Sequence, residues 1–559
     1  MLPFSVLFSL VAATGATAKM LSPGFQSLHF NVSRGSSYGT ATAGAKPRLR
    51  VRDSVDGTIE TTLENEQTFY SVDLKIGSTN QDVVVLVDTG SSDLWVTGSN
   101  NPYCGSSSSS SSSSRKYRVL DDLTSHDSLT TTGNSAKSDL NVVNKASDVT
   151  SDTSSLKAID CSQYGVFNPN NSDSFHSNET EFYIVYGDST FAYGTWGYDT
   201  VTVGGTEVKD FSFAVANRTN STVGVLGIGL TGLETTYSGS RASSLTSRYQ
   251  YANLPVKMVE DGLISKRLYS LYLNDYNADS GSVLFGGIDH AKYSGTLTTV
   301  PIINTLSSSG YDTPIKLEVA LSGISFDGGD SALSSPIAAL LDSGTTLTYI
   351  PSDAIASIAD SVGARYSSSY GYYLMDCPSS SIDTNLTFDF DGLTISAPID
   401  NFILAADSSG STCVLALMDY GTDYAILGDS FLRSAYIVYD LDELEIAMAQ
   451  VKYTTEENIE VVTGSIPSAS AAEGYSSTAS VDGSDSTDLN GVIGGAGLSS
   501  ADDDGEESTS SVTQTASRST SSSTRSGSSG SSSSTGAGSH NAPFIAAAAS
   551  LAMGMLALL

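Results

Sequence analysis

Two short motifs in this chain each place an aspartate directly after an apolar run. The first reads Val85-Leu-Val-Asp88-Thr-Gly-Ser-Ser92, and the second reads Ala339-Leu-Leu-Asp342-Ser-Gly-Thr-Thr346. A carboxyl group at the end of a buried strand is costly to ionise, because the surrounding medium has a low dielectric constant. Two such carboxyls in contact would share one proton, so one could act as a general base towards water while the other polarises a carbonyl group.

The residues after each aspartate suit the support of such a pair. The first hydroxyl can hold the two turns against each other, and the next hydroxyl can hydrogen-bond the carboxylate from outside. The glycine between them allows the backbone to turn close to the pair, where a Cβ would obstruct it. We therefore expect Asp88 and Asp342 to be supported by Thr89, Gly90, Ser91, Ser343, Gly344 and Thr345.

Both motifs belong to an internal repeat. Each half of the chain later carries an apolar-apolar-Gly sequence, at 225–227 and at 426–428. Short strand patterns dominate between about 69 and 451, beginning with the alternation of residues 70–76 and the apolar run 83–87.

Few segments in this region favour helices. The better candidates are residues 254–264 and 351–361, the second of which opens with Pro351-Ser352-Asp353. The sequence therefore predicts a mostly-β fold.

The motifs resemble those of the pepsin-like aspartic proteases and, among them, the fungal GPI-anchored yapsins. The resemblance covers residues 69–451, and it rests on VDTGSSDLWV (87–96), YGDSTFAYGTWGYDTV (186–201), VGVLGIGL (223–230), LYSLYLNDYNADSGSVLFGGID (268–289), LLDSGTTLTYIP (340–351) and YAILGDSFLRSAYIVYD (424–440). It implies a bilobal fold with pseudo-twofold symmetry, with an N-lobe at about 53–235 and a C-lobe at about 236–455. It also implies that the catalytic pair is Asp88 and Asp342, and that the enzyme is an endopeptidase with an acid pH optimum.

The same resemblance implies a flap over the site. Tyr186 matches the flap tyrosine and Trp95 its partner, and Gly187 and Asp188 follow on the flap. Ser189 stands where most relatives have a second glycine. Yapsins resemble each other in preferring Lys or Arg at the cleavage site. An acid at position 188 would accept such a side chain of the substrate. The alternatives are a buried structural tyrosine at 186 and a solvated carboxylate at 188.

The charge balance excludes some functions. The 559 residues include 27 Lys and Arg against 61 Asp and Glu, for a formal net charge of −34. Nucleic-acid binding needs a basic face, so we expect no nucleic-acid partner. Five scattered histidines and cysteines without C-x-x-C spacing indicate no metal site, and we expect no cofactor.

Both ends of the chain have the composition of targeting signals. Residues 1–18 are typical of a signal peptide and 536–559 of a GPI-attachment signal, with a buried helix and a tail-anchored helix as the alternatives. The segment 19–52 ends in a basic cluster and favours a removable pro-segment over a plain linker. Residues 456–535 are rich in Ser, Thr and Gly, which predicts a disordered, O-glycosylated stalk. A membrane contact through the GPI anchor follows from these assignments.

Cysteines and sequons agree with secretion. The four cysteines allow three pairings, of which Cys104–Cys161 and Cys377–Cys413 are favoured because each pair falls in one half of the catalytic region. N-glycosylation sequons begin at Asn31, Asn170, Asn178, Asn217, Asn220 and Asn385.

Between the first two cysteines, residues 105–160 read as a disordered insertion with a basic stretch at 115–118. Cleavage there would leave two disulfide-linked chains of a protein we otherwise expect to be monomeric. The competing class is a wall-bound glycoprotein of the same fold with a dead site.

Overall fold

The computed structural model describes most of the region between the first motif and the predicted stalk. In full, the described residues are 26–29, 31–32, 60–61, 63–65, 69–104, 159–186, 190–239, 248–276, 278, 281–368, 372–405, 411–419, 421, 423–476 and 481. The predicted signal peptide, residues 105–158 of the insertion, the flap residues 187–189 and the predicted GPI signal lie outside them.

The N-lobe is built on a nine-stranded sheet. Alternating apolar residues of its central strands face a common core, and β5 also pairs with β9, so the sheet folds back on itself. In sheet order the strands are β2 (Asn31–Val32), β4 (Leu63–Asn65), β5 (Tyr70–Ile76), β6 (Gln81–Asp88), β11 (Gly224–Gly227), β7 (Leu94–Thr97), β10 (Thr206–Thr219), β9 (Phe191–Val203) and β8 (His176–Val185).

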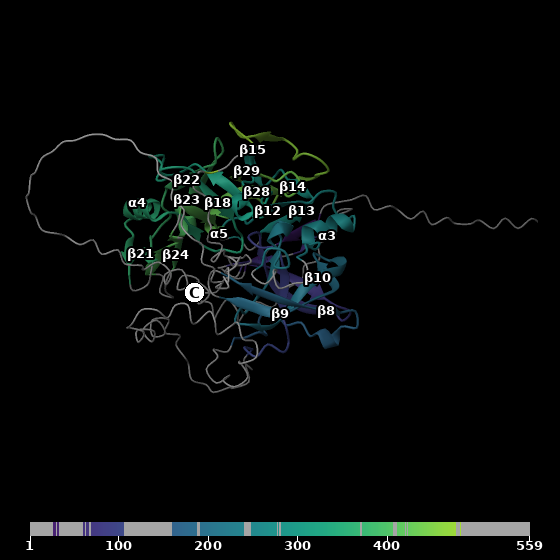
Figure 1. The fold of residues 1–559 in the computed structure, drawn as a ribbon. Coiled ribbons are helices and arrows are strands. Elements are labelled where there is room, and N and C mark those ends of the chain that lie inside the picture. Colours follow the sequence, from purple (N-terminus) through teal and green to yellow (C-terminus); the bar gives the residue numbers. More distant parts are fainter. Residues whose placement is uncertain are drawn as a thin grey trace, which may run out of the picture.

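The C-lobe contains three smaller sheets. The first, in sheet order, contains β16 (Glu318–Leu321), β18 (Ile337–Leu341), β27 (Tyr424–Leu427), β19 (Thr348–Tyr349) and β26 (Leu417–Met418). The second contains β17 (Gly323–Phe326), β22 (Asn385–Asp389) and β23 (Thr394–Pro398). The third contains β20 (Arg365–Ser367), β21 (Tyr372–Asp376), β25 (Thr412–Leu415) and β24 (Ile403–Ala405). Figure 1 shows the blue N-terminal strands β8–β10 on one side of the molecule and the green elements β18, β22, β23 and α4 on the other.

An eight-stranded sheet contains segments from both ends of the described chain. In order it holds β3 (Glu60–Thr61), β1 (Gln26–His29), β13 (Ser282–Phe285), β12 (Leu268–Tyr272), β28 (Ala435–Asp440), β29 (Glu445–Val451), β15 (Tyr293–Pro301) and β31 (Ala469–Ala471). Strand β1 lies inside the predicted pro-segment and pairs antiparallel with β13. A two-stranded sheet joins β14 (Gly287–Asp289) to β30 (Ile459–Val461).

Helices are few among the described residues. The α-helices are α3 (Leu254–Glu260), α4 (Ser352–Val362) and α5 (Asp429–Leu432), and the 3-10 turns are η4 (Pro169–Asn171), η5 (Thr231–Leu233), η7 (Ser307–Ser309) and η8 (Ile399–Phe402). Helix α3 falls within the predicted segment 254–264, and α4 overlaps the predicted segment 351–361 and ends one residue later. The mostly-β, bilobal fold is confirmed. None of the described helices is long and apolar enough to cross a membrane.

Two disulfides each close a loop within one lobe. They join Cys104 to Cys161 and Cys377 to Cys413, which are the favoured pairings. The first lies at the base of the predicted insertion 105–160, so the two ends of that insertion are covalently joined.

The folded domain continues past residue 455, where the sequence placed the start of the stalk. We call residues 452–476 the C-terminal strap. Its strand β30 pairs with β14, and β31 pairs in parallel with β15. Val462 of the strap is fully buried and Ile466 is 5% exposed. The ammonium of Lys292 donates to the carbonyl oxygens of Thr454 at 3.0 Å and Glu456 at 2.8 Å. The polar composition of this segment does not indicate that it packs on the domain, because most of its hydrogen bonds to the domain are made by backbone groups.

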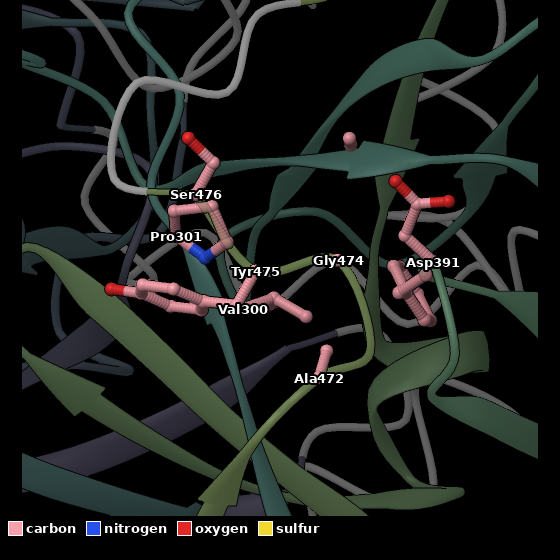
Figure 2. A pocket seen from close by; sticks show the side chains of 9 residues that line it. Val300, Pro301, Asp391, Ala472, Gly474, Tyr475 and Ser476 are labelled. Carbon is pink, nitrogen blue, oxygen red and sulfur yellow. The ribbon is translucent and has the colours of Figure 1, made fainter.

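The last part of the strap lies over the C-lobe. Its residues Ala472, Gly474, Tyr475 and Ser476 line a small pocket of about 30 Å³ together with Val300, Pro301, Ala320, Phe390 and Asp391. Figure 2 shows Ser476 and Tyr475 beside Pro301 and Val300. The hydroxyl of Tyr475 donates to Oε2 of Glu445 at 3.2 Å, which ties the strap to β29.

Removal of the strap should destabilise the domain. A chain that ends after Val451 loses the burial of Val462 and Ile466, worth about 3–6 kcal/mol for two fully buried aliphatic side chains. A chain that ends after Val481 keeps both. Thermal unfolding of the two proteins should give a clearly lower melting temperature for the shorter one. Equal melting temperatures would show that the strap contributes nothing to the fold.

Candidate active site

The two motif aspartates lie at equivalent places in the two lobes. Asp88 is the last residue of β6, which pairs in parallel with β11, and Asp342 directly follows β18, which pairs in parallel with β27. Glycine 227 of the first apolar-apolar-Gly sequence pairs with Asp88, and the backbone N–H of Asp342 donates to the carbonyl of Leu427. The internal repeat therefore corresponds to a repeated strand arrangement that delivers both carboxyls to the centre of the molecule.

Each carboxyl is held by its own turn in the same way. The N–H of Gly90 donates to Oδ1 of Asp88 at 2.7 Å, and the N–H of Gly344 donates to Oδ1 of Asp342 at 2.8 Å. The next hydroxyl in each motif donates to the other oxygen of its carboxyl; these are Ser91 to Asp88 and, at 2.6 Å, Thr345 to Asp342. These bonds stabilise the ionised form and fix the orientation of each carboxyl.

The two carboxyls lie against each other's turns. A Cβ added to Gly90 would lie 2.6 Å from Oδ1 of Asp342, and one added to Gly344 would lie 2.5 Å from Oδ1 of Asp88. Asp88 is 2% exposed and Asp342 is fully buried. The structure thus brings both aspartates, together with the six predicted supporting residues, to one place.

Burial and mutual repulsion raise the pKa values of the pair. Burial is the largest cause for Asp88, and the charge of Asp342 raises the pKa of Asp88 further. Burial also raises the pKa of Asp342, while hydrogen bonds from Thr345, Asp88 and the two glycines lower it. A hydrogen bond between the carboxyls links their titrations, so the two aspartates gain and lose protons as a pair.

Hydroxyls on the two turns join the lobes. Thr89 Oγ1 donates to the carbonyl of Leu341 at 2.8 Å, and Ser343 Oγ donates to the carbonyl of Val87 at 2.9 Å. In return, the N–H of Ser343 donates to Thr89 Oγ1 at 2.9 Å and the N–H of Thr89 to Ser343 Oγ at 3.2 Å. This reciprocal set of four bonds fixes the distance between the two turns.

The start of the predicted flap is described. Tyr186 follows β8, and Trp95 Nε1 donates to the hydroxyl of Tyr186 at 2.7 Å, so the expected pair is in contact. The N–H of Tyr186 donates to the carbonyl of Thr190, which closes the hairpin around the tip. Gly187 and Asp188 lie outside the described residues.

Sequence reasoning missed a buried charged group beside the pair. Asp429, the first residue of α5, is fully buried, and burial raises its pKa while the Arg433 guanidinium lowers it and the charge of Asp342 raises it. Arg433 Nε donates to the hydroxyl of Tyr70 in the other lobe at 3.0 Å. The charged residues of the block GDSFLR, which interrupt an otherwise apolar run, were the available signal.

Comparison with known proteins decides the family. The model of the family described as eukaryotic aspartyl protease matches residues 69–451. The chain belongs to this family. As an aspartic protease it resembles Aspartic proteinase 3 of Saccharomyces cerevisiae, with 47% identity over 81% of this chain and 82% of the relative. Aspartic proteinase yapsin-3 of the same yeast is 43% identical over 74% of this chain and 73% of the relative.

A further relative comes from a different yeast. Secreted aspartic protease 9 of Candida albicans is 38% identical over 78% of this protease and 87% of the relative. The resemblance to yapsins seen in the motifs is confirmed, and the chain is an aspartic-type endopeptidase.

Proposed function

We propose that this protease hydrolyses peptide bonds with Asp88 and Asp342 as a catalytic pair that shares one proton. The observation that carries the proposal is that two buried carboxyls, each on the turn of its own lobe, are hydrogen-bonded to each other and lie against the glycine of the opposite turn. In this proposal Asp342 is the ionised member, and it takes a proton from a water molecule, whose oxygen then attacks the substrate carbonyl carbon. Asp88 donates its proton to the carbonyl oxygen. Proton return to the leaving nitrogen breaks the C–N bond, with no covalent enzyme intermediate.

The direction of the pKa shifts gives an acid optimum. The raised pKa of Asp88 keeps its proton in place at pH values where an ordinary aspartate is ionised. As the pH rises through that raised pKa, the pair loses the proton that polarises the carbonyl, and activity falls. At very low pH the second carboxyl is protonated as well, and the general base is lost.

A peptide assay tests this activity. The purified protein should cleave a peptide that contains Lys or Arg at about pH 4–5, just above the ordinary pKa of an aspartate, where the raised pKa of Asp88 retains the shared proton. A statine-type inhibitor, which mimics the tetrahedral intermediate, should abolish the cleavage. Failure to cleave any member of a peptide library under these conditions would favour the dead-site glycoprotein.

We also propose a preference for basic residues at the cleavage site, with Asp188 as the acceptor. Replacement of Asp188 by Asn should lower kcat/KM for a Lys- or Arg-containing peptide by about 10–100-fold, the range of a lost charge-assisted hydrogen bond. The same substitution should leave kcat/KM for a matched peptide with Leu at that position nearly unchanged. An equal loss on both peptides would assign Asp188 to the shape of the flap instead.

We also propose where the protein is delivered and how it is processed. Secretion to the cell surface is supported by two disulfides and by the similarity to Secreted aspartic protease 9 of Candida albicans. The sequon residues Asn170, Asn178 and Asn385 are exposed, as glycan attachment requires. We further propose that 536–559 is a signal for attachment of a GPI anchor, that a pro-segment is removed, that the protein is a monomer, and that cleavage within 105–160 leaves two chains joined by Cys104–Cys161.

A further inference from the structure

The N-lobe holds a second pair of buried carboxyls, which the proposed reaction does not use. Asp93 precedes β7 and is 2% exposed; Glu234 follows η5 and is fully buried. Tyr251 bridges them, because its hydroxyl donates to Oδ1 of Asp93 at 2.7 Å and its N–H donates to Oε2 of Glu234 at 2.8 Å. The N–H of Thr235 donates to the other Asp93 oxygen at 2.9 Å.

The described surroundings of this pair are acidic or neutral. Among the described residues, the titratable groups that act on it are the two carboxyls themselves with Tyr249 and Tyr251. Within the described parts of the chain, neither carboxyl forms an ion pair with a Lys, Arg or His, and Oε1 of Glu234 is buried without a hydrogen-bond partner. A buried carboxylate without a cation is costly, so the pair favours its protonated form.

Burial sets the direction of both titrations. It raises the pKa of Glu234 to about 10, with the charge of Asp93 as the second cause. It raises the pKa of Asp93 to about 6 against the hydrogen bonds from Thr235 and Tyr251, which lower it.

The pair is connected to the flap through aromatic side chains. We define the aromatic platform as Trp95, Phe182 and Trp196, which are buried together with Tyr186 and Tyr251 packed against them. The rings of Tyr251 and Trp196 pack edge to face with their centroids 5.0 Å apart, and those of Trp196 and Phe182 with their centroids 5.3 Å apart. Trp95 follows Asp93 by two residues and holds the Tyr186 hydroxyl. The platform therefore lies between the acidic pair and the flap.

We propose that Asp93 and Glu234 are positioning residues that hold the aromatic platform only while the pair keeps its protons, so that their ionisation sets the upper pH limit of activity. The kinetic part of this proposal rests on the proposed peptidase reaction, whereas the structural part does not. Below about pH 4 the carboxyls are protonated in folded and unfolded chains alike. Above it the folded N-lobe binds more protons than the unfolded one, and the folded-to-unfolded ratio falls by up to about ten-fold per pH unit for each extra proton.

Tryptophan fluorescence tests the structural part directly. The chain has two tryptophans, and both, Trp95 and Trp196, belong to the platform. The wild-type emission should change between about pH 6 and 8, above the pKa of Asp93. Glu234→Gln keeps the shape of the side chain but cannot ionise. This substitution should raise the pH midpoint of the emission change by at least about one pH unit. The alkaline limb of kcat/KM should move with it.

Asp199→Asn provides a matched control in the same lobe. Asp199 is 2% exposed and accepts hydrogen bonds from Ser172 and Ser174 at 2.7 Å each, away from the pair. Its substitution should leave the fluorescence midpoint unchanged or lower it. If Glu234→Gln does not fold, Asp93→Asn should give the upward shift.

Two results would overturn the proposal: wild-type emission that stays constant to pH 9, or a Glu234→Gln midpoint equal to that of wild type. Because fluorescence needs no substrate, a protein without peptidase activity would still give either answer. An upward midpoint in an inactive protein would support the structural part and refute the proposed reaction separately.

Discussion

Replacement of either Asp88 or Asp342 by Asn should reduce peptide hydrolysis by on the order of 10⁴-fold, the upper range for loss of a positioned general acid or base. Both carboxyls are buried and hydrogen-bonded by their own turns, so an amide of the same shape should fit without large rearrangement. Asn at 342 removes the general base, and Asn at 88 removes the group that gives its proton to the carbonyl. Steady-state kinetics at pH 4–5 measure the loss.

Residues that act as a unit are not additive, so the double substitution should be barely slower than either single one. Asp289→Asn, at a 5% exposed aspartate of the C-lobe that accepts backbone N–H groups of Ala291 and Asn458, serves as the control. Substantial activity in the protein with Asn at 88 would contradict the assignment of the pair. Circular dichroism of each variant distinguishes lost chemistry from lost fold.

Replacement of Gly344 by Ala should lower kcat/KM by about 100-fold, the effect of misplacing a catalytic group by about 1 Å. The new Cβ would lie 2.5 Å from Oδ1 of Asp88 and 3.1 Å from Oδ1 of Asp342. The first distance is too short for any contact of a real Cβ, and the carboxyl it meets has nowhere to rotate without losing the bonds from Gly90 and Ser91. The pair must therefore separate or twist.

Gly464→Ala is the matched control, because a Cβ there meets nothing within 4 Å. It should retain wild-type kcat/KM and melting temperature. If Gly344→Ala were as active as Gly464→Ala, the close approach of the carboxyl of one lobe to the turn of the other would be wrong. A fall in activity with an unchanged melting temperature would place the damage at the pair.

Local sequence was sufficient to predict the pair and its neighbours. Each aspartate follows a short apolar strand and precedes a hydroxyl and a glycine, so strand, turn and hydrogen-bonding groups are adjacent in the chain. The internal repeat then indicated that the two turns are related. The disulfide pairing also followed from position, because each pair falls within one lobe.

Features made by distant residues were not predictable in this way. The strap reads as a polar linker, and its bonds to β14, β15 and Lys292 join segments far apart in sequence. The contact of Tyr251 with Asp93 and Glu234 likewise depends on how three loops pack. Nothing near Glu234 in the sequence indicates that its carboxyl is buried.

Neutron diffraction from a crystal of the unliganded protease at about pH 4–5 tests the central proposal most directly, because it locates hydrogen isotopes on carboxyl oxygens. The shared-proton pair predicts a single deuteron between Asp88 and Asp342, bound to one of the two carboxyls. A deuteron on each carboxyl, or none on either, would contradict the mechanism.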